Sequence, residues 1–279
     1  MSLLSAVSVH PNKPTRQWFG WFKLNYAIFF ALAVYAIIVP LIAPDSAIAV
    51  NPARRFQPPF GATLLGTDHL GRDLGVLVAQ GLRMSLLLAL SVVAIGALLG
   101  WIVGACSAYL GGYVDGILNR IMDAFNAFPG IVLAIALTTA LGSSIPTLIA
   151  VLVAATWVNY ARVVRARVLS LKSEEYVVAS RMYGASLFRV LTRHIWPNTA
   201  DLLLSVALAQ VANVMLAEAT ISFLGFGLQP PEISLGLLIS SEKDYLQTNG
   251  YPVLLAGAVL MIACASLTTA ALALRKEES

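Results

Sequence analysis

Charge is the scarcest property of this 279-residue sequence: 11% of its residues are Asp, Glu, Lys or Arg, whereas 58% are hydrophobic. Soluble domains carry about 25% charged residues, because charge keeps a folded surface in water. The low charge therefore excludes an ordinary soluble domain and predicts that most of the chain lies in a lipid bilayer. No nucleic-acid partner is expected.

The sequence also has few residues of the kinds that bind metals or perform catalysis. Its two cysteines, Cys106 and Cys264, lie in apolar stretches, where a lone cysteine is most often a small hydrophobic filler. The three histidines are scattered singly. An intramembrane protease would need a catalytic pair such as Ser/His or two Asp within its spans, and the sequence has none. We expect no metal site and no catalytic residue in this chain.

Long stretches without charge predict six transmembrane helices and therefore an all-α polytopic membrane protein. About 20 apolar residues cross a hydrocarbon core of about 30 Å at 1.5 Å per residue. The charge-free stretch between Asp123 and Arg162 is too long for one crossing and contains the breaker LGSSIP, so it predicts two spans joined by a tight turn. The predicted spans are residues 24–43, 84–108, 124–141, 145–160, 202–224 and 253–274.

Turn-forming residues mark the expected ends and bends of these spans. Pro44 closes the first span, the Gly-Gly pair at 111–112 ends the second, and Pro129 is expected to kink the third. Residues 44–83 are polar and rich in turn formers. Within them, Asp73 is typical of a helix N-terminus, and it predicts a short helix, DLGVLVAQGLR, that leads into the second span.

The positive charges are distributed unevenly across the predicted topology. With six spans, the N-terminal segment 1–23, residues 109–123, residues 162–197 and the tail 275–279 share one side. That side has thirteen of the eighteen Lys and Arg residues, so the positive-inside rule makes it cytoplasmic and makes 44–83 extracytoplasmic. Five or seven spans would place the termini on opposite sides of the membrane and make the difference in positive charge between the two sides less clear. No removable signal peptide is expected, because no small-residue cleavage site follows the first apolar run.

A basic segment, residues 159–198, holds seven of these cations between two long apolar stretches. Scattered charge of this kind is common in cytoplasmic loops and serves to set topology, but here the order of residues is more specific. Ser173-Glu174-Glu175 predicts a helix start with acids at the positive end of the dipole, and Gly184-Ala185-Ser186 predicts a turn. A second helix is expected over 187–194, with Pro197 marking its end. Two helices around a glycine turn predict a docking surface for another protein.

The sequence EYVVASRMYGASLFRVLTRHIWPN within this segment resembles the "EAA" loop of ABC-transporter permeases, in which Glu-Ala-Ala is followed after three residues by Gly and later by an Ile-x-Leu-Pro type ending. The leading positions here are Val178, Ala179 and Ser180, followed by Gly184 and the ending HIWP at 194–197. Val178 replaces the family's Glu, Ser180 replaces an Ala, and Trp replaces Leu in the ending. The glycine and its distance to the proline carry most of the resemblance.

Two further motifs resemble the second permease subunit of dipeptide, oligopeptide and nickel importers. They are GTDHLGRD at 66–73 and EATISFLGFGLQPPEISLG at 218–236, where Leu235 stands in place of the family's frequent Trp. The similarity covers about residues 61–261. The family's usual C-terminal tail, GD-x-LRD-x-LDP, is missing, since the sequence ends LTTAALALRKEES.

The resemblance implies a type I ABC importer permease fold, with a permease domain at 84–274 and cytoplasmic coupling helices in the loop 162–197, between the fourth and fifth spans. The chain would form half of a translocation path for di- or oligopeptides delivered by an extracytoplasmic binding protein. Nickel or a metal chelate is the alternative substrate. A stand-alone channel or secondary transporter is the alternative of another class, although the sequence shows no internal repeat.

The same resemblance implies partners. A second homologous permease would complete the path, and two ATPase subunits would bind ATP and Mg²⁺, since this sequence has no G-x-x-x-x-G-K-[ST] motif. The chain itself would be a transport subunit rather than an enzyme. The expected location is the cytoplasmic membrane of a bacterium or archaeon, with many passes and both termini in the cytoplasm.

Two sets of candidate site residues follow. The residues expected to contact the ATPase are Glu175, Tyr176, Ala179, Ser180, Arg181, Gly184, Ala185 and Phe188. The translocation-path candidates are polar residues within spans: Glu218, Asn213, Gln210 and Asn126. Asn159 is also polar within a span.

Two of the motifs allow more than one interpretation. Glu218 is the one acid well inside an apolar span, and it either meets a substrate cation or makes a structural contact near the outer interface. Asp68, His69 and Asp73 have the residue types of a metal site, but a capping and turn network is the more common arrangement for them.

Overall fold

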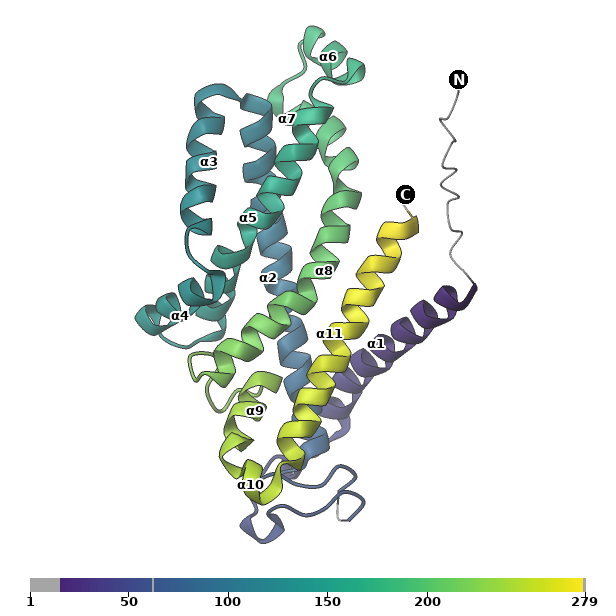
Figure 1. Ribbon diagram of the computed structural model, residues 1–279, viewed down its shortest axis with the longest axis vertical. Coiled ribbons are helices and arrows are strands. Elements are labelled where there is room, and N and C mark those ends of the chain that lie inside the picture. Colours follow the sequence, from purple (N-terminus) through teal and green to yellow (C-terminus); the bar gives the residue numbers. More distant parts are fainter. Residues whose placement is uncertain (1–15, 62, 278–279) are drawn as a thin grey trace, which may run out of the picture.

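The computed structural model describes residues 16–61 and 63–277, and this part of the chain is helical, with one isolated β-bridge between Thr67 and Asp73 (Figure 1). The all-α prediction is confirmed. The α-helices are α1 (Arg16–Ile42), α2 (Leu74–Leu110), α3 (Gly112–Asn126), α4 (Gly130–Leu141), α5 (Ile145–Leu171), α6 (Glu175–Met182), α7 (Leu187–Val190), α8 (Trp196–Phe223), α9 (Leu235–Glu242), α10 (Leu246–Asn249) and α11 (Tyr251–Glu277). Short turns of other helix types are η1 (Asp45–Ala47), η2 (Pro52–Arg54), the π-helical η3 (Leu191–Ile195) and η4 (Lys243–Tyr245).

Five helical runs in the described residues are long and apolar enough to cross a membrane, and a sixth crossing arises if the bent pair α3–α4 counts as one. The ends predicted at Gly111 and near 202–224 and 253–274 agree with the helices within a few residues. Helix α6 lies at one end of the bundle, and α10 lies at the other end beside residues 44–73 (Figure 1).

Helix α2 is longer than predicted. Asp73 caps its N-terminus by accepting hydrogen bonds from the backbone N–H groups of Gly75 and Val76, as the sequence indicated. The short helix expected after Asp73 and the span expected from residue 84 are one continuous helix of 37 residues. The boundary drawn between residues 83 and 84 therefore falls inside a helix, because nothing there removes a backbone hydrogen bond.

The third span was wrongly predicted as one helix over 124–141. Helix α3 ends at Asn126, and α4 begins after Pro129 at an angle of 83° to it. Pro129 was expected to kink the span, and instead the chain breaks there, because the residue before a proline is pushed out of helical geometry. Helix α4 has 12 residues, which is about 18 Å at 1.5 Å per residue and too short to cross alone.

The basic segment begins inside a helix and not in a loop. Helix α5 runs on to Leu171 where an end near residue 160 was expected. Its arginines are held by acids on α3: Arg165 makes a bidentate pair with Asp115, with N–O distances of 2.6 and 2.8 Å, and Arg162 pairs with Asp123 at 2.8 Å. The predicted end marked where the apolar stretch stops, and arginine is a good helix former, so the helix continues beyond it.

Pro197 was predicted to end the second cytoplasmic helix, and this was also wrong. Helix α7 passes through the π-helical turn η3 into α8 without a break. In that turn the Trp196 N–H donates to the Leu191 carbonyl, five residues back. A wider π-turn changes which carbonyls face Pro197, whose ring would clash with the carbonyl of residue i−4 in a regular α-helix.

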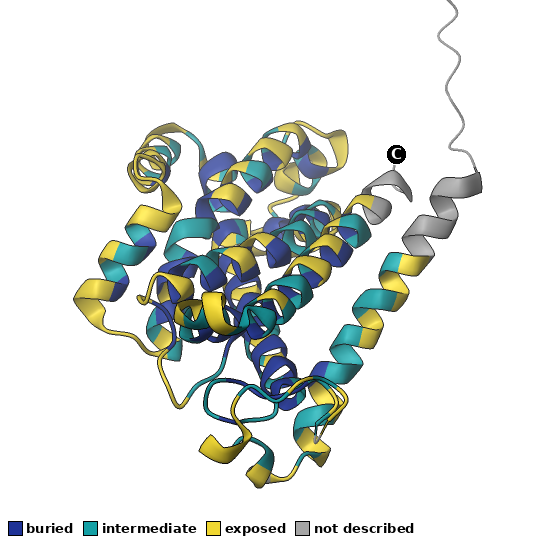
Figure 2. Ribbon diagram, turned by 60° about the horizontal axis from the view of Figure 1, so that its bottom comes forward, coloured by how far each residue is buried: buried dark blue, intermediate teal, exposed yellow. Residues whose placement is uncertain are grey.

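Helix α2 lies at the centre of the bundle and packs most closely on α5. A Cβ atom added at Gly100 would lie 2.7 Å from the Trp157 carbonyl oxygen, and one at Gly104 would lie 2.3 Å from that of Ala161. Only glycine fits such a close backbone approach. Buried residues gather in this central region, whereas α1 is mostly half-buried or exposed over its described side chains (Figure 2).

Candidate functional site

The helices α6 and α7 form a hairpin, residues 175–190, at one end of the bundle (Figure 1). Gly184 has a φ of +77° and sits just past α6, where the Ala185 N–H bonds the Ser180 carbonyl and the Gly184 N–H bonds the Arg181 carbonyl. These two bonds define a Schellman motif, which favours glycine at this position. Ser186 then caps α7 by accepting from the Arg189 N–H. The predicted glycine turn is confirmed.

The α6–α7 hairpin is anchored to the bundle by a few apolar side chains. Val177 and Val190 are fully buried and belong to a core cluster with Val168 of α5. The Lys172 ammonium donates to the Ala108 carbonyl at 2.9 Å, close to the end of α2. The hairpin is therefore fixed to two of the long helices rather than suspended in a loop.

The exposed face of the hairpin combines large apolar and aromatic side chains with the charged Glu175, Arg181 and Arg189. Six of the eight predicted coupling residues are exposed there, and Ser180 and Ala185 are half-buried. The most exposed large side chains are Tyr183 (93%), Met182 (83%) and Phe188 (77%), and the sequence analysis missed the first two. Helical periodicity could have found Met182, because five residues place it about 140° around α6 from the buried Val177.

Arg181 does not project freely from this face. Its guanidinium lies over the ring of Tyr109 on α2, 5.5 Å from the centroid, in a cation–π contact. Tyr176 packs near the ring of His194, with 5.9 Å between centroids. Both contacts tie the hairpin to neighbouring helices and leave Tyr183, Met182 and Phe188 as its free apolar surface.

A second feature is a cavity of about 200 Å³ between α4, α5 and α8. Asn159, Gln210 and Asn213 all line it, so the structure brings together two predicted path residues and the extra polar residue of the fourth span. Asn126, the third predicted amide, is exposed at the end of α3 and is not among the lining residues.

Glu218 does not line this cavity. It is completely buried where α2, α8 and α9 meet, and its two carboxylate oxygens accept hydrogen bonds from Ser85 Oγ at 3.0 Å and Ser222 Oγ at 2.8 Å. Those hydroxyls in turn accept from the Leu235 and Leu228 backbone N–H groups. These contacts support the structural role of Glu218, which holds the loop between α8 and α9.

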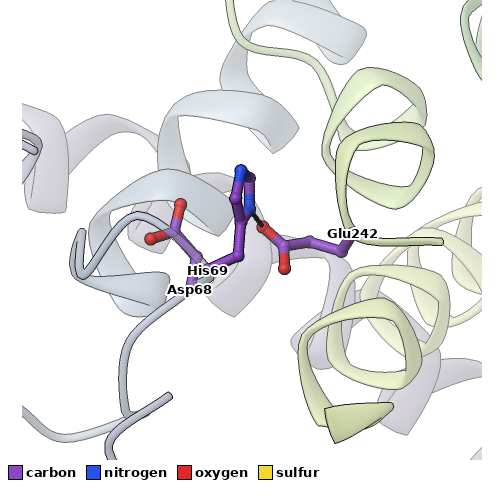
Figure 3. Close-up of side chains that lie close together, drawn as sticks. All are labelled: Asp68, His69 and Glu242. Atoms are coloured by element: carbon purple, nitrogen blue, oxygen red, sulfur yellow. Dashed lines mark hydrogen bonds and ion pairs between the residues drawn. The ribbon is translucent and has the colours of Figure 1, made fainter. Parts of the chain in front are cut away.

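Asp68, His69 and Glu242 form a cluster that joins the turn at residues 68–72 to α9 (Figure 3). Asp68 accepts from the Leu70 and Arg72 N–H groups through Oδ1 and from the Arg72 side chain through Oδ2, so both of its carboxylate oxygens are hydrogen-bonded. His69 Nδ1 lies 2.5 Å from Glu242 Oε1. Figure 3 shows His69 directed at Glu242, with the Asp68 carboxylate on the other side of the imidazole. The predicted turn and cap contacts of Asp68 and Asp73 are confirmed, whereas His69 pairs with Glu242, and the ligand atoms of Asp68, His69 and Glu242 lie within 4.8 Å of one another, which is close enough to hold a metal ion.

Glu242 is the unexpected member of this cluster. Its burial raises the pKa of the carboxyl group, and the hydrogen bond from His69 acts in the opposite direction. His69 also stacks on Tyr245, with 4.9 Å between ring centroids. The contact joins residues 44–73 to the region between α8 and α11, so these two segments lie at the same end of the bundle. Two segments on one side of a membrane are separated by an even number of crossings, and the six-span prediction places four spans between them.

Comparison with known proteins places this architecture in context. Residues 96–276 match the family described as the binding-protein-dependent transport system inner membrane component. The match spans the α6–α7 hairpin and the cavity between α4, α5 and α8.

Several curated proteins are similar to the chain over most of its length. A Brucella suis protein, provisionally named a peptide transport system permease, is 37% identical over 88% of this chain and 83% of its own length. The dipeptide transport system permease protein DppC of Bacillus subtilis is 34% identical over 82% of this chain and 69% of its own. The protein of the same name from Alkalihalophilus pseudofirmus is 32% identical over 89% and 84%.

Proposed function

The chain belongs to the family of inner membrane components of binding-protein-dependent transport systems, and from this we propose that it is the permease subunit of an ATP-driven importer of peptides. The observation that carries the proposal is the α6–α7 hairpin, which exposes large apolar side chains at the end of the bundle and lies within the family match. The three similar proteins are named for peptide or dipeptide transport, and this favours peptides over nickel.

The hairpin would receive the movement of an ATPase subunit. Its first arm follows α5 directly, and its second arm continues through η3 into α8. A helical run of 37 residues, Leu187–Phe223, therefore links the docking face to the membrane interior without a flexible joint. An ATPase that binds one orientation of the hairpin more tightly than another would favour one orientation of this helical run. ATP binding would in this way shift the equilibrium between the inward-open and outward-open states.

The partners follow from the same proposal. Two ATPase subunits would bind ATP and Mg²⁺, a second permease would complete the path, and an extracytoplasmic binding protein would deliver the peptide. The hairpin and both termini would face the cytoplasm, and residues 44–73 with α9 and α10 would face the binding protein. The thirteen cations on the hairpin side support this orientation.

Reconstitution tests the proposal directly. The chain would be purified with a second permease, ATPases and the binding protein from the same source and placed in proteoliposomes. We expect ATP-dependent uptake of labelled dipeptides and no uptake of Ni²⁺. Uptake without ATP would favour a secondary transporter, and ATP-dependent uptake of Ni²⁺ alone would reverse the choice of substrate.

A further inference from the structure

Three amide side chains face the cavity between α4, α5 and α8. Asn159 comes from α5, and Gln210 and Asn213 come from α8 at i and i+3, which places them on one face of that helix. The remaining lining is apolar or small except for Thr156, and no Asp, Glu, Lys, Arg or His is among the lining residues. The lining is therefore mostly apolar, and the polar groups that it does contain are uncharged.

The hydrogen bonds of these amides are only partly satisfied. Asn213 Nδ2 donates to Gln210 Oε1 at 2.7 Å. Asn159 is exposed, and within the described part of the chain its side chain has no hydrogen-bond partner. The nearby Thr156 hydroxyl, by contrast, donates to the Leu152 carbonyl of its own helix. The three amides thus retain free donors and acceptors that point to a further partner.

The acyl chains of lipid cannot be that partner. An amide placed in hydrocarbon without a hydrogen bond costs several kcal/mol, so this face of α5 and α8 must meet water, protein or ligand. A cavity of about 200 Å³ holds several water molecules, each of which occupies about 30 Å³ in the liquid. The cavity is wide enough to hold water, and its three amide groups are unfavourable in contact with acyl chains.

We propose that Asn159, Gln210 and Asn213 form a contact site for the backbone of the peptide during its passage. A side-chain amide offers both N–H donors and a carbonyl acceptor, which are the same groups that every peptide bond offers in return. Because the lining has no charged residue, the site binds peptides through their backbone and does not distinguish them by the charge of their side chains. This inference rests on the proposed function and adds the residues that meet the substrate.

Charge introduced at one of these positions tests the inference. In the reconstituted complex, initial uptake of Gly-Lys and Gly-Glu would be measured with the same saturated binding protein for wild type, Asn213→Asp and Asn213→Lys. Two unit charges about 4 Å apart in water interact by about 1 kcal/mol, which is about a fivefold change in rate. Because Asn213→Asp attracts the Lys side chain and repels the Glu side chain, each by about fivefold in rate, we expect it to raise the Gly-Lys/Gly-Glu ratio about 25-fold, and we expect Asn213→Lys to lower the ratio by a similar factor.

Asn198 provides the matched control, because it lies on the same helix, is exposed and is absent from the cavity lining. Asn198→Asp and Asn198→Lys should leave the ratio within about twofold of wild type. If the Asn213 variants do not assemble, the same pair at Asn159, whose side chain has no partner to lose, provides the measurement.

The possible outcomes separate the two proposals. Equal loss of both peptides in the Asp and Lys variants, with an unchanged ratio, would mean that the amides pack against the second permease, and it would overturn the contact site. A wild-type complex that transports neither peptide would overturn the proposed function itself. Opposite shifts of the ratio would support both.

Discussion

At the scale of single residues, Gly184 shows how one backbone angle shapes the α6–α7 hairpin. No atom lies within 4 Å of where its Cβ would be, so the position has room for a side chain. The constraint is the φ of +77°, which costs an ordinary L-residue about 1–2 kcal/mol and is tolerated best by glycine and then asparagine. Conformation, rather than space, selects the residue here.

Gly184→Asn and Gly184→Val separate these two effects. Asparagine should keep most of the peptide uptake per ATP hydrolysed, whereas valine, which is β-branched and strained at positive φ, should lower it about fivefold or more. The measurement is uptake and ATPase rate in the same vesicles. Equal activity of the two variants would show that the left-handed turn is not needed for coupling.

Tyr183 allows a test of the docking face that does not disturb folding. Because 93% of the residue is exposed, Tyr183→Ser should leave thermal stability unchanged but weaken ATPase binding about tenfold, as expected for loss of an interfacial aromatic anchor. Tyr113→Ser is the control, since Tyr113 is 85% exposed on α3, outside the hairpin. Binding would be followed by titrating the ATPase onto the permease in detergent. Similar losses in both variants would argue against the hairpin as the docking face.

At the scale of elements, two ion pairs hold α3 against α5, and they differ in burial. The side chains of Arg165 and Asp115 are 27% and 21% exposed, whereas those of Arg162 and Asp123 are 50% and 71% exposed. A bidentate pair shielded from water stabilises more than an exposed single contact. Most of the attachment of α3 to α5 by ion pairs should therefore come from Asp115.

Asp115→Asn should destabilise the protein by about 1–3 kcal/mol, because it leaves a shielded arginine without its charge partner. Asp123→Asn should cost less than about 1 kcal/mol. Denaturant titration of the two variants in detergent, followed by intrinsic fluorescence, would compare them. Equal destabilisation would mean that burial of the pair does not determine its contribution.

The elements also show which parts of the fold the sequence could predict. The sequence correctly predicted the helix end at Gly111, the turn at Gly184 and the helix cap at Asp73, because each of these residues acts on the backbone within a few residues. The break at Pro129 was located but its angle was not, since the angle depends on how α4 packs against α5. The prediction that a helix ends at Pro197 was wrong, because the π-turn before this proline lets the helix continue through it.

The candidate sites divide in the same way. The position of the hairpin follows from local motifs, but the pairing of Asn159 with Gln210 and Asn213 requires the packing of α5 against α8. No local pattern indicated that Ser85, which is 133 residues away, donates a hydrogen bond to Glu218. Contacts between distant elements were therefore the part that the sequence could not predict.

At the scale of the whole molecule, the His69–Glu242 contact and the α6–α7 hairpin lie at opposite ends of the bundle (Figure 1). Membrane-impermeant maleimide tests whether they lie on opposite sides of the membrane. In a background with Cys106→Ala and Cys264→Ala, we expect Leu64→Cys to be labelled in intact cells and Tyr183→Cys only after permeabilisation. Both positions are well exposed. Labelling of both in intact cells would contradict the topology.

The contact between His69 and Glu242 has a consequence for biogenesis. The two residues are 173 positions apart, so at about 5–20 residues per second a ribosome needs roughly 10–35 s to supply the second after the first. The Asp68–Arg72 turn needs only its own residues and can present the imidazole during that time. The contact between His69 and Glu242 therefore forms only after α9 has been synthesised, and its absence distinguishes an unfinished chain from a complete one during that interval.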